Sequence, residues 1–364
     1  MTLHRYFAMK FLRTFFAMLA GFAVFLWLVD LLEHIRRFDA AEVGFAQLAY
    51  MAALRLPEIL YEAVNLIVLL TAVMVFIGLS RSSELVIARG AGRSALRSLM
   101  APIGAALVLA AVVVALFNPV VAAMSKEYRS EENRLRGSER VVSVGREGLW
   151  LRQGDTGRQT AIHAESSNSD GTQLFGVTFF GFDGNDNAQW RVDGAEAVLG
   201  DGVWVVSEAK RWNLGGERNP EAGAETRATV FVETDLTRDQ IRDSFGVPSA
   251  IPIWDLPAFI ASLEAAGFSA RAHRVWFQAE LSKPLVFAAM VLIGAVFTSG
   301  HARFARTGLM VLFAVLAGFG VHFVSNLAQV MGDSGQLPIA VAVWAPPLAA
   351  ICLALAMLLH LEDG

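Results

Sequence analysis

The sequence contains few cysteines and few charged residues. Its single cysteine, Cys352, cannot form a disulfide within the chain. Charged residues make up 18% of the chain, below the ~25% typical of soluble domains. The formal net charge is −4, and without a basic footprint the sequence gives no support to a nucleic-acid partner.

Motifs for nucleotide or metal chemistry are also missing. No G-x-x-x-x-G-K-[ST] sequence occurs, so the chain does not bind ATP by that route. His163 and Glu165 match the H-x-E of zinc deaminases, but no paired cysteines follow and both lie in an expected strand, so we interpret the match as chance. Glu33 and His34 are adjacent, and neighbouring helical residues diverge, so a hydrated membrane interface is favoured over a metal site.

What the chain does have is six long apolar runs. A helix needs about 20 apolar residues to cross a bilayer, so each run, with its flanks, predicts one span. Gly332–Gln336 predicts the turn between the last two. The runs, three on each side of a charged, Gly-rich block at 126–283, are Thr14–Val29, Ala63–Ser80, Ser98–Ser125, Pro284–Gly300, Thr307–Gly332 and Ser334–Leu361.

The first run resembles a signal peptide in one respect, because basic residues precede it. It nevertheless stays apolar to Leu32 apart from Asp30, which is long for a cleaved segment and predicts an uncleaved span. Lys and Arg are retained on the cytoplasmic side of short loops. They favour cytoplasmic N and C termini with the 126–283 block outside, because the loops then inside hold Arg5, Lys10, Arg13, Arg81, Arg89, Arg93, Arg97, Arg303 and Arg306.

The central block predicts an all-β domain. Acidic residues outnumber basic ones in it, and short aromatic and β-branched segments alternate with Gly, Asn and Asp. Their spacing suggests an antiparallel sandwich or jelly roll. The expected strands are Gly148–Arg152, Gln159–Ala164, Leu174–Phe182, Ala188–Val192, Val203–Ser207 and Thr226–Glu233.

After the strands, Asp255 and Pro257 predict the start of an amphipathic helical stretch that leads back to the membrane by Lys283. The expected fold class is thus an α-helical polytopic membrane protein with six spans and an inserted all-β, jelly-roll-like domain. Its parts are 1–125 with spans one to three, 126–253 with the β domain, and 254–364 with the connecting helix and spans four to six.

The loop Arg81–Arg97 predicts a short helix between two spans. Ser82 or Ser83 can cap it, Glu84 lies in its first turn where the helix dipole favours an anion, and Gly90 and Gly92 can end it. A carboxylate presented there suits docking to a soluble partner. The alternative is an ordinary basic loop.

Two polar pairs, one after span one and one within span five, stand out from the apolar runs. Arg36 and Arg37 follow span one, where guanidinium groups can hold phosphate, although arginines that only anchor the helix at the interface would look the same. His322 and Asn326 lie one turn apart in span five, and hydrogen bonding to another helix is favoured over a transport role.

Taken in order along the chain, several short motifs resemble the LptF/LptG family of lipopolysaccharide export permeases. They are Arg5-Tyr6 and Lys10 before span one, SELVIARGAGRS at 83–94, SVGREG before Gly148-Leu149-Trp150, Gln189-Trp190-Arg191 with Val203-Trp204, and Lys283-Pro284 at span four. The SEL…GAG loop is the most specific element. SVGREG and GLW are more similar to LptG than to LptF.

The resemblance implies a permease subunit of an ABC transporter that extracts lipopolysaccharide from the bacterial inner membrane and passes it to a periplasmic bridge. It implies a second, LptF-like permease, a cytoplasmic LptB-like ATPase dimer and a single-span LptC-like protein as partners. The chain itself would be no enzyme and would bind no cofactor, since ATP and Mg²⁺ belong to the ATPase.

The resemblance also assigns roles to residues. Coupling to the ATPase would involve Ser83, Glu84, Leu85, Arg89, Gly90 and Gly92. Lipid phosphates would meet His34, Arg36 and Arg37. A lateral gate between spans one and five would be formed by Phe22, Phe25, Leu26, Phe313, Phe319 and His322.

Two other functions fit parts of the sequence. A permease of the lipoprotein-release kind would have four spans rather than six. A membrane receptor with an extracytoplasmic β sensor would need a cytoplasmic output domain. A membrane enzyme ranks below both, because no span displays a paired catalytic constellation.

Overall fold

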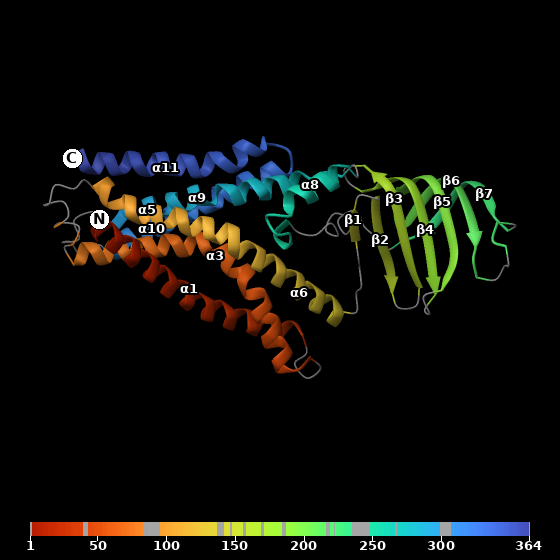
Figure 1. Cartoon of the computed structure of the whole chain (residues 1–364), viewed down its shortest axis with the longest axis horizontal. Coiled ribbons are helices and arrows are strands. Elements are labelled where there is room, and N and C mark those ends of the chain that lie inside the picture. The colour runs from red at the N-terminus through yellow and green to blue at the C-terminus, as the bar shows by residue number, and fades with distance from the viewer. Residues whose placement is uncertain are drawn as a thin grey trace. The chain divides into compact units, whose positions relative to one another are not determined.

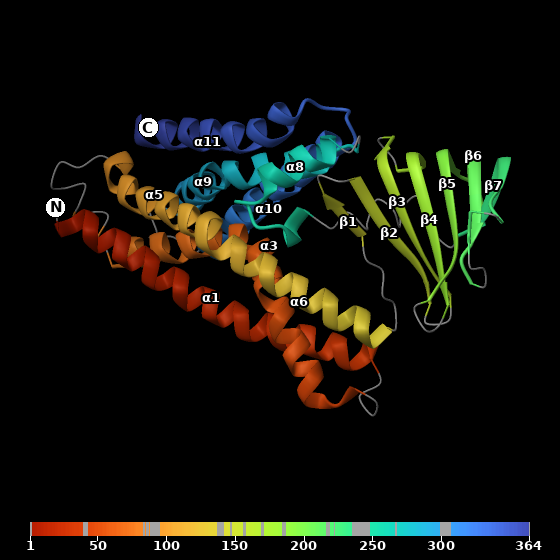
Figure 2. The ribbon, with the colours of Figure 1, turned by 45° about the vertical axis from the view of Figure 1, so that its right-hand side comes forward.

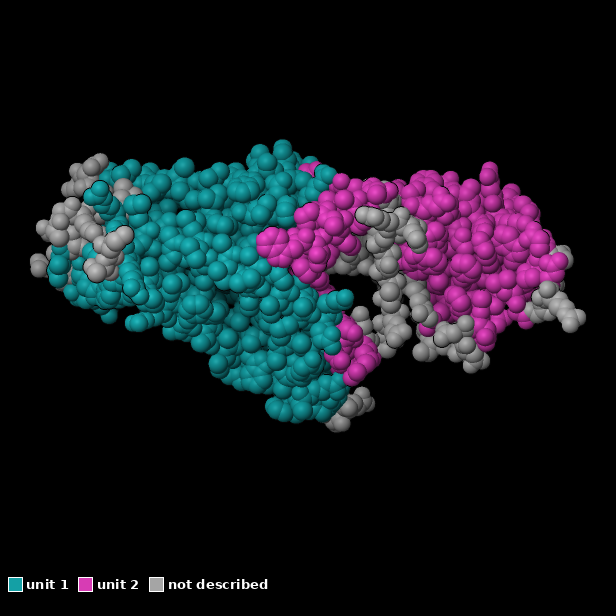
Figure 3. All heavy atoms as spheres, viewed as in Figure 1, with its two compact units in different colours: residues 1–128, 274–364 teal, residues 129–273 magenta. Residues whose placement is uncertain are grey.

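The computed structural model describes residues 2–363 except 39–42, 83, 85–86, 88–94, 137–141, 146–147, 156–157, 169–170, 184–186, 216–218, 222, 235–247, 266–267 and 299–306. The chain divides into two compact units, which Figure 3 colours separately. The helical unit comprises residues 1–128 and 274–364, and the sheet unit comprises residues 129–273. We describe each unit by itself.

Within the described residues, six helices are long and apolar enough to cross a membrane, as the six runs predict. The third span runs through a π-helical turn, η1 (Val113–Phe117), and the fifth and sixth are joined by a turn at the predicted place, after Asp333. The spans, shown in Figure 1, are α1 (Thr2–Arg37), α3 (Phe45–Arg81), α5 (Ala95–Val112) with α6 (Asn118–Arg136), α9 (Arg271–Thr298), α10 (Thr307–Asp333) and α11 (Ile339–Asp363).

Phenylalanines at helical spacing fix α1 onto the helical core. Phe7, Phe11 and Phe15 recur every fourth residue, so they lie on one face of the helix, and all three are buried. On α10, Gly318 allows a close approach to α3, since a Cβ there would come within 2.2 Å of the Leu69 side chain. Gly318 thus serves close helix packing, whereas a Cβ at Gly21 or Gly320 would meet nothing within 4 Å.

The spans differ strongly in how much of them the chain itself covers. In α9, 72% of the apolar window is buried, but in α1 and α10 the values are 17% and 11%. α9 is therefore the centre of the helical unit, whereas α1 and α10 present most of their apolar surface outward.

The sheet unit is one antiparallel sheet of seven described strands in the order β1 to β7. Figure 2 shows the strands following one another side by side. All six expected strands are confirmed, five of them extended by several residues, and β1 is additional. The bounds are β1 (Val142–Gly145), β2 (Gly148–Asp155), β3 (Arg158–Ser167), β4 (Gln173–Asp183), β5 (Ala188–Leu199), β6 (Val203–Asn213) and β7 (Glu225–Glu233).

The inserted all-β domain is confirmed, but its strand order is simpler than a jelly roll. A jelly roll distributes its strands over two sheets through Greek-key connections. Here every described strand pairs with its neighbour in sequence, because the connections with Gly, Asn and Asp are short enough to make hairpins. Sequence spacing indicates strands and turns but not which strands pair.

The sheet has one buried face, and the strand register explains it. Leu174, Ala197, Val206 and Val230 are partners across β4, β5, β6 and β7, and all four are buried. Helix α8 (Leu256–Ala265), which follows the 3-10 turn η2 (Pro248–Ala250) and starts where Asp255 predicts, contributes Leu263 to the same core. The amphipathic stretch is therefore two helices, of which α8 belongs to the sheet unit and α9 enters the membrane.

Candidate functional site

The N-terminal end of α1 contacts Glu84, which lies three residues after the end of α3. Glu84 Oε1 accepts hydrogen bonds from Lys10 Nζ at 3.0 Å, from Tyr6 Oη at 3.3 Å and from Ser82 Oγ at 2.8 Å. Lys10 also lies over the Tyr6 ring, 5.4 Å from its centroid. We call Tyr6, Lys10, Ser82 and Glu84 the acid clamp. It fixes a carboxylate at the end of a span and leaves its second oxygen, Oε2, without a hydrogen-bond partner among the described residues.

The clamp keeps Glu84 ionised. Burial by itself would raise the pKa of this carboxyl, but the hydrogen bonds from Ser82, Lys10 and Tyr6 and the charge of Lys10 outweigh it and lower the pKa below its ordinary value of 4.5. A lowered folded-state pKa means that the clamp stabilises the fold above the ordinary pKa. That contribution is lost only as the pH falls through the lowered value.

The remaining coupling residues, Ser83, Leu85, Arg89, Gly90 and Gly92, lie outside the described residues. Ile87, inside the same loop, is 70% exposed. The sequence pointed to Glu84 and, for other reasons, to Lys10 and Tyr6, but only the structure brings the three together.

At its other end, α1 carries a buried polar cluster that the sequence did not reveal. Asp30 forms an ion pair with Arg55 of α3 at 3.0 Å, and His34 Nδ1 lies 2.8 Å from the Asp30 carbonyl oxygen. His34 Nε2 lies 3.1 Å from the Tyr128 hydroxyl of α6. Both ring nitrogens of the buried His34 are therefore engaged within the helical unit, so His34 has no free donor for a lipid phosphate.

Arg36 and Arg37 are exposed at this end but do not share one site. Arg36 lines a pocket of about 400 Å³ with Glu33, Asp30 and apolar residues such as Leu26, and Arg37 is not among its lining residues. Successive helical residues point about 100° apart, which explains the separation. Of the two arginines only Arg36 lines this pocket, and a headgroup contact by either stays a prediction.

The predicted gate residues lie on the two spans that the chain covers least. Phe25, Phe313 and Phe319 are exposed by 60%, 49% and 54%. Phe22 and Leu26 on α1 and His322 on α10 are half-buried. The structure thus shows an apolar surface on each helix, and contact between the two helices of different subunits stays a prediction.

His322 and Asn326 do hydrogen-bond, but to each other. The Asn326 amide nitrogen lies 3.2 Å from His322 Nε2 within α10. A partner on another helix, expected from their place in a span, is not seen among the described residues.

The centre of the helical unit holds an ion pair that was not predicted from the sequence. Lys283 Nζ lies 2.8 Å and 3.0 Å from the two Glu280 oxygens, and 3.2 Å from the centroid of the Tyr61 ring. Tyr61 donates its hydroxyl to Glu280 and accepts a hydrogen bond from Asn118 at 3.3 Å. The sequence signal for this ion pair was the spacing of Glu280 and Lys283, which lie three residues apart just before an apolar run.

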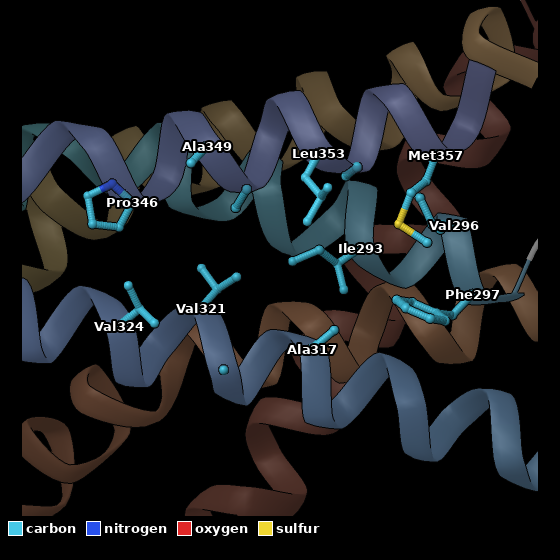
Figure 4. A pocket seen from close by; sticks show the side chains of 13 residues that line it. Ile293, Val296, Phe297, Ala317, Val321, Val324, Pro346, Ala349, Leu353 and Met357 are labelled. Carbon is cyan, nitrogen blue, oxygen red and sulfur yellow. The ribbon is translucent and has the colours of Figure 1, made fainter. Parts of the chain in front are cut away.

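An apolar pocket of about 380 Å³ lies between α9, α10 and α11. Figure 4 shows Ile293, Val321 and Leu353 around it, one from each helix. Its lining carries no charged side chain, so it suits hydrocarbon rather than a polar ligand.

Comparison with known proteins gives one result for the family. A search of curated proteins found no match. The model of the lipopolysaccharide export system permease LptF/LptG family matches residues 5–360, nearly the whole chain, and covers LptF and LptG alike, so the greater similarity to LptG stays a prediction. A match of this extent, on a chain with six apolar spans and an inserted sheet, places the protein in the LptF/LptG family of lipopolysaccharide export permeases.

Proposed function

We propose that this permease uses ATP hydrolysis on a separate cytoplasmic subunit to extract lipopolysaccharide from the inner membrane and pass it to a periplasmic bridge. Membership of the family makes the chain a lipopolysaccharide export permease of the inner membrane. The coupling, the direction of transfer and the individual partners belong to the proposal.

The acid clamp is the observation that carries the coupling. A glutamate held by three donors has a fixed position, so its side chain loses little further conformational freedom when a partner binds it. Because Lys10 and Tyr6 lie on α1, force applied at Glu84 passes directly to span one. Span one is one of the two helices we assign to the gate.

The exposed surfaces of α1 and α10 support a second permease subunit. Their large apolar side chains need either lipid or another protein in the membrane. A homologous LptF-like subunit would pair α1 of one chain with α10 of the other, and the lipid would enter between them. A single-span LptC-like helix would associate at the same gate.

The sheet unit offers a place for acyl chains. A cleft of about 1010 Å³ is lined both by apolar side chains, among them Trp190, Val192 and Phe231, and by polar ones such as Gln153 and Arg211. Phe231 is 68% exposed, which is unusual for a large apolar side chain. An extracytoplasmic route for hydrocarbon would explain it, because acyl chains would then cover the ring. The receptor alternative has no such observation in its favour, and the lipoprotein-release alternative disagrees with the six spans and the matched family.

The orientation has a direct test. A reporter that works only outside the cytoplasm should be active when fused within residues 150–250 and inactive when fused at Gly92 or Ala305. Basic residues in the short loops retain those loops inside, which is the physical reason. Activity at Gly92 would overturn the orientation.

Phosphate capture at the outer end of α1 is tested by substitution of Arg36. Charge-assisted hydrogen bonds contribute about 1.5–3 kcal/mol each, so Arg36→Ala should lower the lipopolysaccharide copurified per complex roughly tenfold. The amount of lipopolysaccharide copurified with Arg36→Lys should lie between those of the wild type and Arg36→Ala, because lysine keeps the charge but loses the planar fork.

Arg37→Ala is the matched control, since Arg37 lies outside the pocket that Arg36 lines, and a smaller loss is expected there. A photocrosslinker at position 36 should capture lipopolysaccharide. Full lipid occupancy in Arg36→Ala, without a crosslink, would show that these arginines only anchor the helix at the interface.

A further inference from the structure

A second cavity in the helical unit is lined largely by polar side chains, of which only His322 has a role above, as a predicted gate residue. It has a volume of about 420 Å³ and lies between α3, α9 and α10. That size falls within the range of small-molecule sites, about 300–1,000 Å³. Its polar lining contrasts with the apolar pocket of Figure 4, although both are enclosed by spans.

Three of its side chains have buried polar atoms without a hydrogen-bond partner. Asn65 Oδ1 on α3, Trp276 Nε1 on α9 and Ser325 Oγ on α10 all line the cavity, and none is bonded within the described residues. They comprise an acceptor, a donor and a hydroxyl that can be either. Buried polar groups are almost always bonded, so three unbonded groups around one cavity indicate a missing polar ligand or water.

The charges around the cavity exclude a phosphate as its main ligand. The lining contains the carboxylates Glu62 and Glu280 and one amine, Lys283. Both Glu280 oxygens already take hydrogen bonds from that amine, and its cation lies over the Tyr61 ring. An incoming anion would meet an excess of carboxylate and no available cation.

The cavity lies toward one end of the spans that line it. Asn65 lies at the beginning of the apolar run of α3, Trp276 lies before the run of α9, and Ser325 lies in the last third of α10. Since α10 crosses in the direction opposite to α3 and α9, the three positions fall toward the same end of the unit, where the apolar runs give way to polar residues.

We propose that this cavity binds the uncharged, hydroxyl- and amide-bearing part of a sugar headgroup, while the phosphates of the same lipid lie elsewhere. The proposal rests on the proposed function for the presence of a glycolipid. It adds a recognition site for the sugar itself, formed by Asn65, Trp276 and Ser325.

The single cysteine of the chain makes the test simple. Cys352 is exposed, and its replacement by alanine gives a background in which Ser325→Cys is the only thiol. The full chain is reconstituted in nanodiscs and treated with a hydrophilic thiol reagent. The thiolate is the reactive form, so a cysteine in the polar cavity should react and one facing hydrocarbon should not.

Phe323→Cys in the same background is the matched control, because Phe323 is 60% exposed on α10 and lines neither cavity. A neutral alkyl glucoside should slow labelling at position 325 severalfold. An anionic phospholipid without a sugar should not. Adding Asn65→Leu should weaken the glucoside protection roughly fivefold, as expected for one lost hydrogen bond.

Three results would overturn the proposal: no labelling at position 325, no protection by the glucoside, or equal protection by both lipids. The first shows a closed cavity, the second a site for water only, and the third a site without selectivity for sugar. The assay needs neither the ATPase nor transport. Failure here therefore leaves the Glu84 coupling untouched, and failure of the coupling leaves this labelling result unchanged.

Discussion

Replacing Glu84 by lysine is expected to lower lipopolysaccharide-stimulated ATP hydrolysis of the assembled transporter at least about tenfold. The substitution removes the carboxylate that we propose docks to the ATPase, and it places a second cation beside Lys10, which now holds Glu84 at 3.0 Å. Loss of one charge-assisted contact, about 1.5–3 kcal/mol, corresponds to roughly a tenfold or larger change. The measurement is the hydrolysis rate, together with the amount of ATPase that copurifies.

One double variant separates docking from local positioning. Lys10→Glu combined with Glu84→Lys restores an ion pair with reversed charges, but it moves the carboxylate from position 84 to α1. If docking is the role of Glu84, the double variant stays as impaired as Glu84→Lys. Recovery in the double variant would show that the acid serves only to hold α1 and α3 together.

Glu225→Lys is the control for charge reversal as such. Glu225 is an exposed acid paired with Arg227 in the sheet unit, and surface pairs of this kind contribute only about 0–1 kcal/mol. It should leave hydrolysis unchanged. If hydrolysis and the yield of ATPase are unchanged in Glu84→Lys as well, the acid clamp has no role in coupling to the ATPase.

The largest effect on stability is expected from breaking the buried pair at the centre of the helical unit. Lys283→Met leaves the Glu280 carboxylate, which is 1% exposed, without its cation. Removing one partner of a buried ion pair typically costs about 3–5 kcal/mol. We therefore expect a marked fall in the midpoint of unfolding and in the amount of folded protein recovered from the membrane.

The double variant Lys283→Met with Glu280→Gln should recover most of that loss, since no unpaired charge remains and the amide can still accept from Tyr61. Thermal unfolding of the wild type, Lys283→Met, Glu280→Gln and the double variant in one detergent gives the coupling free energy between the two positions. A double variant no more stable than Lys283→Met would show that the pair is not the unit that matters.

The division into membrane spans and an inserted sheet follows from the sequence, because both are set by local patterns. Apolar length determines a span, and alternation with turn residues determines a strand. Thus the turn after Asp333 and the start of α8 after Asp255 lie where predicted. The pairing of strands in one sequential sheet could not be predicted, because it depends on contacts between segments and not on their composition.

The site was predictable in part for the same reason. Glu84 stands out by its place near a predicted helix start, but its partners Lys10 and Tyr6 lie more than 70 residues away in sequence. The family resemblance assigned His34 to the lipid phosphates. Only the structure shows that Tyr128 and Asp30 occupy it.

The most direct test of the account is purification of the tagged chain from its native membrane, followed by mass spectrometry of everything that comes with it. The account predicts a homologous permease subunit in equal amount, an untagged ATPase dimer and bound lipopolysaccharide, with the ATPase lost when Glu84 is lysine. Recovery of lipopolysaccharide and the second permease without any ATPase, or equal ATPase yield from the Glu84→Lys chain, would contradict it.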